Sequence, residues 1–107
     1  MNLEIERKFL IKNTEFKKTY FKKKHIIQGF LNSNKNRVVR VRIIDNSAFL
    51  TIKGISDNSG TTRFEWEKEI ALEDAKDLMI LCEKDIIEKN RYYHTLGKHI
   101  IEIDEFL

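Results

Sequence analysis

The chain of 107 residues carries 20 lysine and arginine residues against 17 aspartate and glutamate residues, a formal net charge of +3. This length suits one domain, spanning residues 1–107, with a modest core. So small a net charge excludes a protein held on nucleic acid or membrane by its overall field. The single cysteine, Cys82, excludes an internal disulfide, and no apolar run reaches the roughly 18 residues of a membrane helix. We therefore expect a cytoplasmic protein.

The segment from Leu3 to Ile11 alternates charged and apolar side chains. Because successive side chains of a strand point to opposite faces, Glu4, Glu6 and Lys8 would share one face. Two carboxylates two residues apart in a strand have Cα atoms about 6.6 Å apart, so both can reach one hard cation. A strand with one wet face gives the same alternation, so the interpretation depends on whether later strands repeat it.

The rest of the chain predicts two helices and six further strands. A short helix is expected near residues 13–20, with Phe16 and Tyr20 on its buried edge and the lysines between Lys17 and Lys24 on its wet face. The strands are expected at residues 25–32, 37–45, 47–54, 62–70, 85–94 and 99–107. A second helix is expected at residues 71–82, with an apolar stripe of Leu72, Ala75, Leu78, Met79 and Cys82.

Most of these strands again carry charged residues on one face. The shared faces hold Arg40 and Arg42; Lys53; Arg63, Glu65, Glu67 and Glu69; Lys89, Arg91 and Tyr93; and Glu102 and Asp104. Seven antiparallel strands of this length tend to curl toward a barrel. If the charges point inward, burying them costs several kcal/mol per ion unless they are well paired, so a ligand is expected. A sheet with its charged side in water is the ordinary alternative.

A phosphate chain bridged to a divalent cation meets both halves of this requirement. Carboxylates would hold Mg²⁺ or Mn²⁺ through oxygen ligands, while lysine and arginine side chains would neutralise the polyanion. Single-stranded nucleic acid fits less well, because Arg40 and Arg42 share their face with Val38 and Ile44 rather than with aromatic residues. The three histidines show no zinc-binding spacing.

Seven segments, in order along essentially the whole chain, resemble the motifs of the CYTH superfamily, the triphosphate tunnel metalloenzymes. They are Glu4-Ile5-Glu6-Arg7-Lys8, Gln28-Gly29-Phe30-Leu31, Val39-Arg40-Val41-Arg42, Thr51-Ile52-Lys53-Gly54, Arg63-Phe64-Glu65-Trp66-Glu67, Glu88-Lys89-Asn90-Arg91-Tyr92 and Glu102-Ile103-Asp104-Glu105-Phe106.

The resemblance implies a mainly β (α+β) fold, an antiparallel eight-stranded tunnel with peripheral helices that binds a triphosphate and Mg²⁺ or Mn²⁺. It implies metal binding by Glu4, Glu6, Glu65, Glu67, Glu102 and Asp104. It implies phosphate binding by Lys8, Arg40, Arg42, Lys53, Arg63, Lys89 and Arg91, with Lys8, Lys53 and Lys89 as catalytic cations. The reaction would be in-line attack of a metal-activated water on a terminal phosphorus, with the cations stabilising the developing charge.

Inorganic tripolyphosphate is the substrate that this resemblance favours. Members of the family also act on thiamine triphosphate, on ATP as adenylate cyclases and, more distantly, on RNA, and no feature of this sequence picks out an adenine pocket. A noncatalytic polyphosphate- or nucleotide-binding module is the alternative from another class. We expect a small triphosphate as partner, with no membrane and no nucleic acid.

The C-terminus departs from the family pattern. Family members continue past the segment ending at Phe106 into a further Glu-x-Glu strand and a helix, whereas this chain stops at Leu107. We therefore expect an incomplete tunnel, in a fragment, a natural truncation or the ordered part of a longer protein. Unpaired strand edges at the opening would favour a homodimer.

Overall fold

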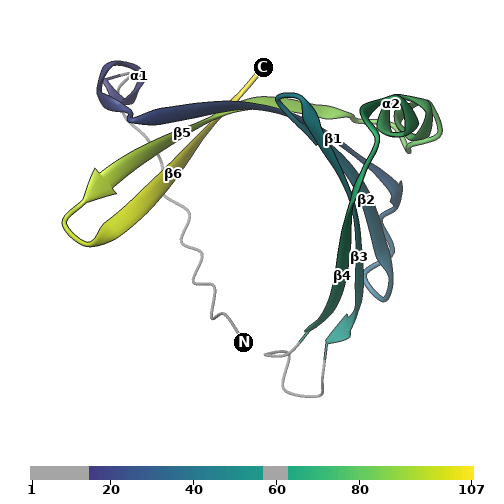
Figure 1. Ribbon diagram of the computed structural model, residues 1–107. Coiled ribbons are helices and arrows are strands. Elements are labelled where there is room, and N and C mark those ends of the chain that lie inside the picture. Colours follow the sequence, from purple (N-terminus) through teal and green to yellow (C-terminus); the bar gives the residue numbers. More distant parts are fainter. Residues whose placement is uncertain (1–14, 57–62) are drawn as a thin grey trace.

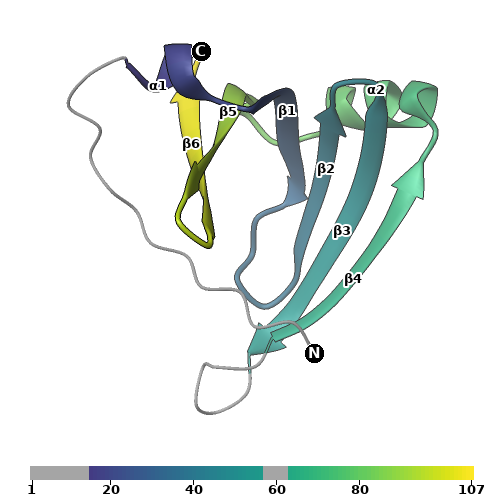
Figure 2. The same cartoon turned by 60° about the vertical axis from the view of Figure 1, so that its left-hand side comes forward.

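The computed structural model describes residues 15–56 and 63–107, which form one antiparallel six-stranded sheet in the order β4-β3-β2-β1-β5-β6. The strands are β1 (Lys22–Asn32), β2 (Val38–Ile44), β3 (Ser47–Ser56), β4 (Arg63–Ile70), β5 (Ile87–Leu96) and β6 (His99–Phe106). The helices are α1 (Phe16–Thr19) and α2 (Leu72–Ile80). The sheet curves into an open arch with both helices on its convex side, called the outer face here (Figure 1 and Figure 2).

The predicted antiparallel, mainly β fold with peripheral helices is confirmed. Two tight turns set the pairing of β2 with β3 and of β5 with β6, because each contains a residue with positive φ, Asp45 at 52° and Gly97 at 60°. Such turns match the twist of the strands that they join. Among the described residues the edge strands β4 and β6 do not pair, so the arch stays open.

The apolar core lies on the outer face, beneath α2. Val41, Ala48 and Ala75 are fully buried there. Partly buried residues pack around them: Leu31, Ile43, Leu50, Ile70, Leu72, Leu78, Met79 and Cys82. The predicted stripe of α2 therefore packs on the sheet, and Cys82 is a packing residue whose thiol has a pKa raised by burial. No helix in the described residues is long and apolar enough to span a membrane.

The concave side of the arch, called the inner face here, carries the charged residues. Val41 packs under α2 on the outer face, so its neighbours Arg40 and Arg42 point inward. Tyr92 is buried on the outer face against Phe16 of α1, so the residues on either side of it also point inward. By the pairing register the inner face includes Lys22, Lys24 and Gln28 of β1, Arg40 and Arg42 of β2, Thr51 and Lys53 of β3, Glu65, Glu67 and Glu69 of β4, Lys89, Arg91 and Tyr93 of β5, and Glu102 and Asp104 of β6.

The prediction for the lysine-rich segment was wrong in part. Helix α1 ends at Thr19, because Tyr20 is extended, with φ −71° and ψ 151°. The segment from Lys22 to Lys24 lies in β1, three residues before the predicted start of that strand, and pairs with Tyr93, Tyr92 and Arg91 of β5. This long-range pairing outweighs the good helix propensity of lysine. The predicted first strand, residues 3–11, lies outside the described residues.

Gly29 supplies a test of the packing between β1 and the outer-face core. A Cβ at this position would lie 2.6 Å from Ile86 Cδ1, 2.8 Å from Cys82 Sγ and 2.9 Å from Met79 Sδ. Because three side chains converge on the position, no single rotation relieves the overlap. We expect Gly29→Ala to lower the free energy of unfolding by about 1–3 kcal/mol, measured by urea denaturation.

Gly54 is the matched control for this experiment. A Cβ there would lie 3.5 Å from Phe64 Cβ, an ordinary contact. Gly54→Ala should therefore leave stability unchanged or raise it slightly by restricting the unfolded chain. Equal stability of the two variants would contradict the close packing at Gly29.

Candidate functional site

Three guanidinium groups lie close together on the inner face, those of Arg40 and Arg42 from β2 and that of Arg91 from β5. Burial lowers the pKa of Arg40. Burial, followed by the positive charges of Arg40 and Arg91, lowers the pKa of Arg42 to about 10. Like charges held together in this way destabilise their own charged forms, and an anion bound between them would remove that penalty.

The two arginines of β2 are not ion-paired with a described carboxylate, although the charges of Glu67 and Glu65 partly offset the lowering of the Arg40 pKa by burial. Arg42 Nε donates a hydrogen bond to Gln28 Oε1, a neutral acceptor, at 3.2 Å. Arg40 Nε is buried and has no hydrogen-bond partner among the described residues, and neither does Thr51 Oγ1 directly across from it. No ion pair joins either arginine to a described carboxylate. Both guanidinium groups are therefore available to a ligand.

Arg91 has a different environment, because carboxylates of β6 surround it. Its Nε lies 2.8 Å from Asp104 Oδ1 and its Nη2 lies 3.1 Å from Asp104 Oδ2, a bidentate pair. Its Nη1 lies 3.3 Å from Glu102 Oε2. Lys89, a buried cation, adds a third charged donor to Asp104, with Nζ 2.9 Å from Oδ2. The charges on β5 are thus compensated by those on β6.

The pKa values of this network follow from its geometry. Burial raises the pKa of the Asp104 carboxyl, but the hydrogen bonds and charges of Arg91 and Lys89 outweigh it and hold the pKa below its usual value. The hydrogen bond from Arg91 to Asp104 raises the pKa of Arg91 well above its usual range. Asp104 and Arg91 are therefore both ionised at neutral pH.

All the described cations predicted to bind phosphate lie on the inner face. Besides the three arginines, these are Lys53, directly opposite Glu65 of β4, and Lys89. Lys8 lies outside the described residues, as do Glu4 and Glu6, and for Arg63 the structure describes the backbone in β4 but not the side chain. The assigned roles of all these residues stay predictions.

The predicted metal-binding carboxylates are split between the two edges of the arch. Glu65 and Glu67 lie on β4, and Glu102 and Asp104 lie on β6. Within residues 15–56 and 63–107, no three acidic, histidine or cysteine side chains are grouped so that they could hold a metal ion. The donors suit a hard divalent cation by chemistry, since all are carboxylate oxygens. Those of Asp104, however, already accept hydrogen bonds from Arg91 and Lys89.

Sequence analysis missed three inner-face residues, Lys22, Lys24 and Gln28. Lys22 and Lys24 lie with Nζ 5.7 and 5.8 Å from the centre of the Tyr93 ring and extend the cationic surface beyond Arg91. Gln28, which belongs to one of the motifs, is buried on this face. The signal is present in the sequence, because Lys22, Lys24 and Gln28 fall on one period-2 series, but the lysines also fit the predicted wet face of a helix.

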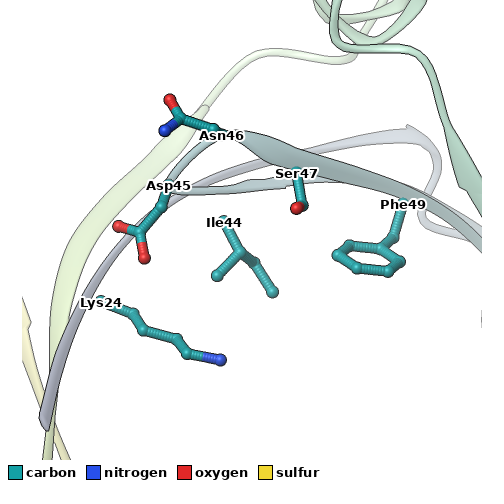
Figure 3. A pocket seen from close by; sticks show the side chains of 6 residues that line it. All are labelled: Lys24, Ile44, Asp45, Asn46, Ser47 and Phe49. Atoms are coloured by element: carbon teal, nitrogen blue, oxygen red, sulfur yellow. The ribbon is translucent and has the colours of Figure 1, made fainter.

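A pocket of about 330 Å³ lies at the end of the inner face, next to the β2–β3 turn. Figure 3 shows Lys24, Ile44, Ser47 and Phe49 pointing into this space, whereas Asn46 points away. Phe49 pairs with Arg42 across the strands, so the pocket borders the arginine cluster. Asp45 fixes the turn, because its backbone N donates to His25 O and its Oδ1 accepts from His25 N, each at 2.9 Å.

The fold is thus that of a small antiparallel β domain, with a charged concave face and helices on its convex face. Over residues 2–106 the sequence matches the family model of the CYTH domain, and the chain belongs to this family. The resemblance found in the motifs is thus confirmed.

A curated relative also supports membership of this family. The chain is 38% identical over 108 residues to a protein named inorganic triphosphatase from Acetivibrio thermocellus, with the match covering 100% of this chain and 67% of the relative.

Solved structures share the fold. The crystal structure of the inorganic triphosphatase NE1496 matches with a TM-score of 0.60 at 24% identity, covering 80% of this chain and 56% of that one. The PH1012 protein of Pyrococcus horikoshii matches with a TM-score of 0.58 at 20% identity, covering 82% of this chain and 57% of that one. The chain therefore spans little more than half the length of these structures.

The Asp104 network predicts a pH-dependent contribution to stability. Because the pKa of Asp104 is lower in the folded state than its ordinary value of 3.8, the network stabilises the fold above that value and loses this effect as the pH falls through the folded pKa. We expect Asp104→Asn to lower the free energy of unfolding by about 2 kcal/mol at pH 7. Urea denaturation between pH 7 and pH 3 would measure it.

The difference in free energy of unfolding between the unmodified chain and Asp104→Asn should shrink as the pH is lowered. Both carry a neutral side chain at this position once the Asp104 carboxyl is protonated. A difference that stays constant down to pH 3 would show that the carboxylate charge does not stabilise the fold.

Proposed function

We propose that this chain binds and hydrolyses a triphosphate on its inner face, with inorganic tripolyphosphate as the favoured substrate and Mg²⁺ or Mn²⁺ as cofactor. The observation that carries the proposal is the cation cluster, in which Arg40 and Arg42 face inward without a described carboxylate partner. Such a cluster needs an anion of several charges. The name of the Acetivibrio relative supports an inorganic triphosphate.

The cations would act by position and charge. Arg40, Arg42 and Lys53 would contact the phosphate chain from one side of the arch, and Lys89 and Arg91 from the other. The planar guanidinium fork suits two oxygens of one phosphate, whereas a lysine ammonium acts as a point charge. The ammonium groups of Lys8, Lys53 and Lys89 would stabilise the charge that develops as the terminal phosphoryl group is transferred.

The carboxylates would hold the divalent cation. Glu65 and Glu67 of β4 are exposed, and they would act with Glu4 and Glu6. Glu102 and Asp104 could join them by giving up contacts with Arg91 and Lys89. A divalent cation bound there would supply charge neutralisation and activation of the attacking water.

A noncatalytic polyphosphate- or nucleotide-binding module is the second candidate. Its support is the ionic network on β5 and β6, in which the Asp104 carboxylate already accepts hydrogen bonds from Lys89 and Arg91. Thiamine triphosphate and ATP are the alternative substrates if the chain is an enzyme.

Phosphate release from tripolyphosphate with Mg²⁺ or Mn²⁺ would test the proposal, with ATP and thiamine triphosphate as competing substrates. We expect release that EDTA abolishes, and at least a hundredfold loss of kcat/KM in Arg42→Gln, because a charged donor to the transferred group is typically worth that much. Lys8→Ala should lose activity as well.

Lys68→Gln is the matched control, since Lys68 pairs with Leu50 and thus lies on the outer face of β4. It removes one positive charge without touching the cluster, so activity should be kept. Tripolyphosphate that raises the melting temperature without being cleaved would favour the binding module. No release and no stabilisation would overturn both candidates.

A further inference from the structure

The three clustered arginines differ in the group that accepts a hydrogen bond from Nε. For Arg91 it is the carboxylate of Asp104. For Arg42 it is the amide oxygen of Gln28. Arg40 Nε has no acceptor among the described residues. Of the three, then, Arg42 combines a fixed orientation with a neutral partner.

Gln28 is built into the sheet beneath Arg42. It is only 7% exposed, and it lies directly opposite Arg42 across β1 and β2. The next residue, Gly29, packs on the outer face against Met79 and Cys82, where a Cβ would collide. That close packing holds the β1 backbone, and with it the base of the Gln28 side chain, in place.

A neutral acceptor has a specific consequence for Arg42. The guanidinium group is planar, so a hydrogen bond at Nε fixes the direction of the two Nη groups. A carboxylate in the same place would also neutralise the charge, as Asp104 does for Arg91. The amide of Gln28 orients the fork without forming an ion pair, so the charge of Arg42 is offset only by the more distant carboxylates of Glu67 and Asp104.

We propose that Gln28 is a positioning residue of the triphosphate site, which holds Arg42 with both Nη groups directed at the ligand and without an ion-pair partner. This inference rests on the proposed function. It gives the Gln28-Gly29 pair of the second motif two separate tasks, since Gln28 acts on the inner face and Gly29 allows close packing on the outer face.

Calorimetric titration with tripolyphosphate, in the absence of divalent cations, tests the proposal on the whole chain. Gln28→Leu keeps the size of the side chain but removes the acceptor, and should weaken binding about tenfold. Gln28→Glu keeps an acceptor but adds a negative charge. It should weaken binding at least as much and also reduce the dependence of affinity on salt concentration, because one cation is neutralised.

A double-mutant cycle separates positioning from a merely structural effect. In an Arg42→Ala background, Gln28→Leu should cause no further loss of affinity, because the group that it positions is gone. Asn90→Leu on the outer face of β5, where Asn90 contacts Glu105, is the control for removing a partly buried amide and should bind tripolyphosphate normally.

Three results would overturn the inference. These are normal affinity in both Gln28 variants, an equal loss from Gln28→Leu with and without Arg42, and an unchanged salt dependence in Gln28→Glu. If the unmodified chain itself fails to bind tripolyphosphate, the proposed function falls, and this inference falls with it. If the unmodified chain binds but one of the three results above is found, only the role of Gln28 falls.

Discussion

Repulsion between positive charges on one face of a curved sheet is the constraint on which this structure depends. Burial lowers the pKa of Arg40 and Arg42, and the neighbouring positive charges, Arg91 beside Arg40 and both Arg40 and Arg91 beside Arg42, lower it further. The fold tolerates this because its stability comes from elsewhere. The apolar faces of the strands pack under α2, and Tyr92 packs under α1. An enclosed apolar layer on one side thus allows an unfavourable ionic layer on the other.

The two halves of the arch handle their charges differently. On β5 and β6, Arg91 and Lys89 meet Asp104, so that each charge is satisfied within the protein. On β1 and β2, Arg42 meets the neutral Gln28 and Arg40 Nε has no described partner. The positive charges that form no ion pair among the described residues therefore include Arg40 and Arg42 on β2 and Lys22 and Lys24 on β1. An anion entering the arch would be attracted first to these strands, and the network on β5 and β6 would rearrange only if the anion reached it.

The sequence predicted well on which face of the sheet the charged side chains lie, but it did not predict which side chains they contact. The alternation in the sequence predicted Arg40, Arg42, Lys89 and Arg91 on a common side of the sheet. The helices cover the opposite side, so the local pattern and the tertiary packing agree. The lysines before His25 were misassigned, because their strand is specified by β5, far away in the chain. The contacts of Gln28 with Arg42 and of Asp104 with Arg91 depend on cross-strand register and could not be derived from spacing. The metal-binding roles also depend on which carboxylates the strand register brings together, and they stay predictions.

The strand order has a consequence for how the chain folds. Strands β2, β3 and β4 follow one another through short connections, and β5 and β6 form a hairpin, so both groups can form from local contacts. The pairing of β1 with β5 instead encloses all of the intervening strands and α2. Closing so long a loop carries the largest entropy cost of any strand pairing in the sheet. Arg91 can therefore approach Arg42 only when β1 and β5 are paired, so neither local group of strands by itself contains the repulsion between them.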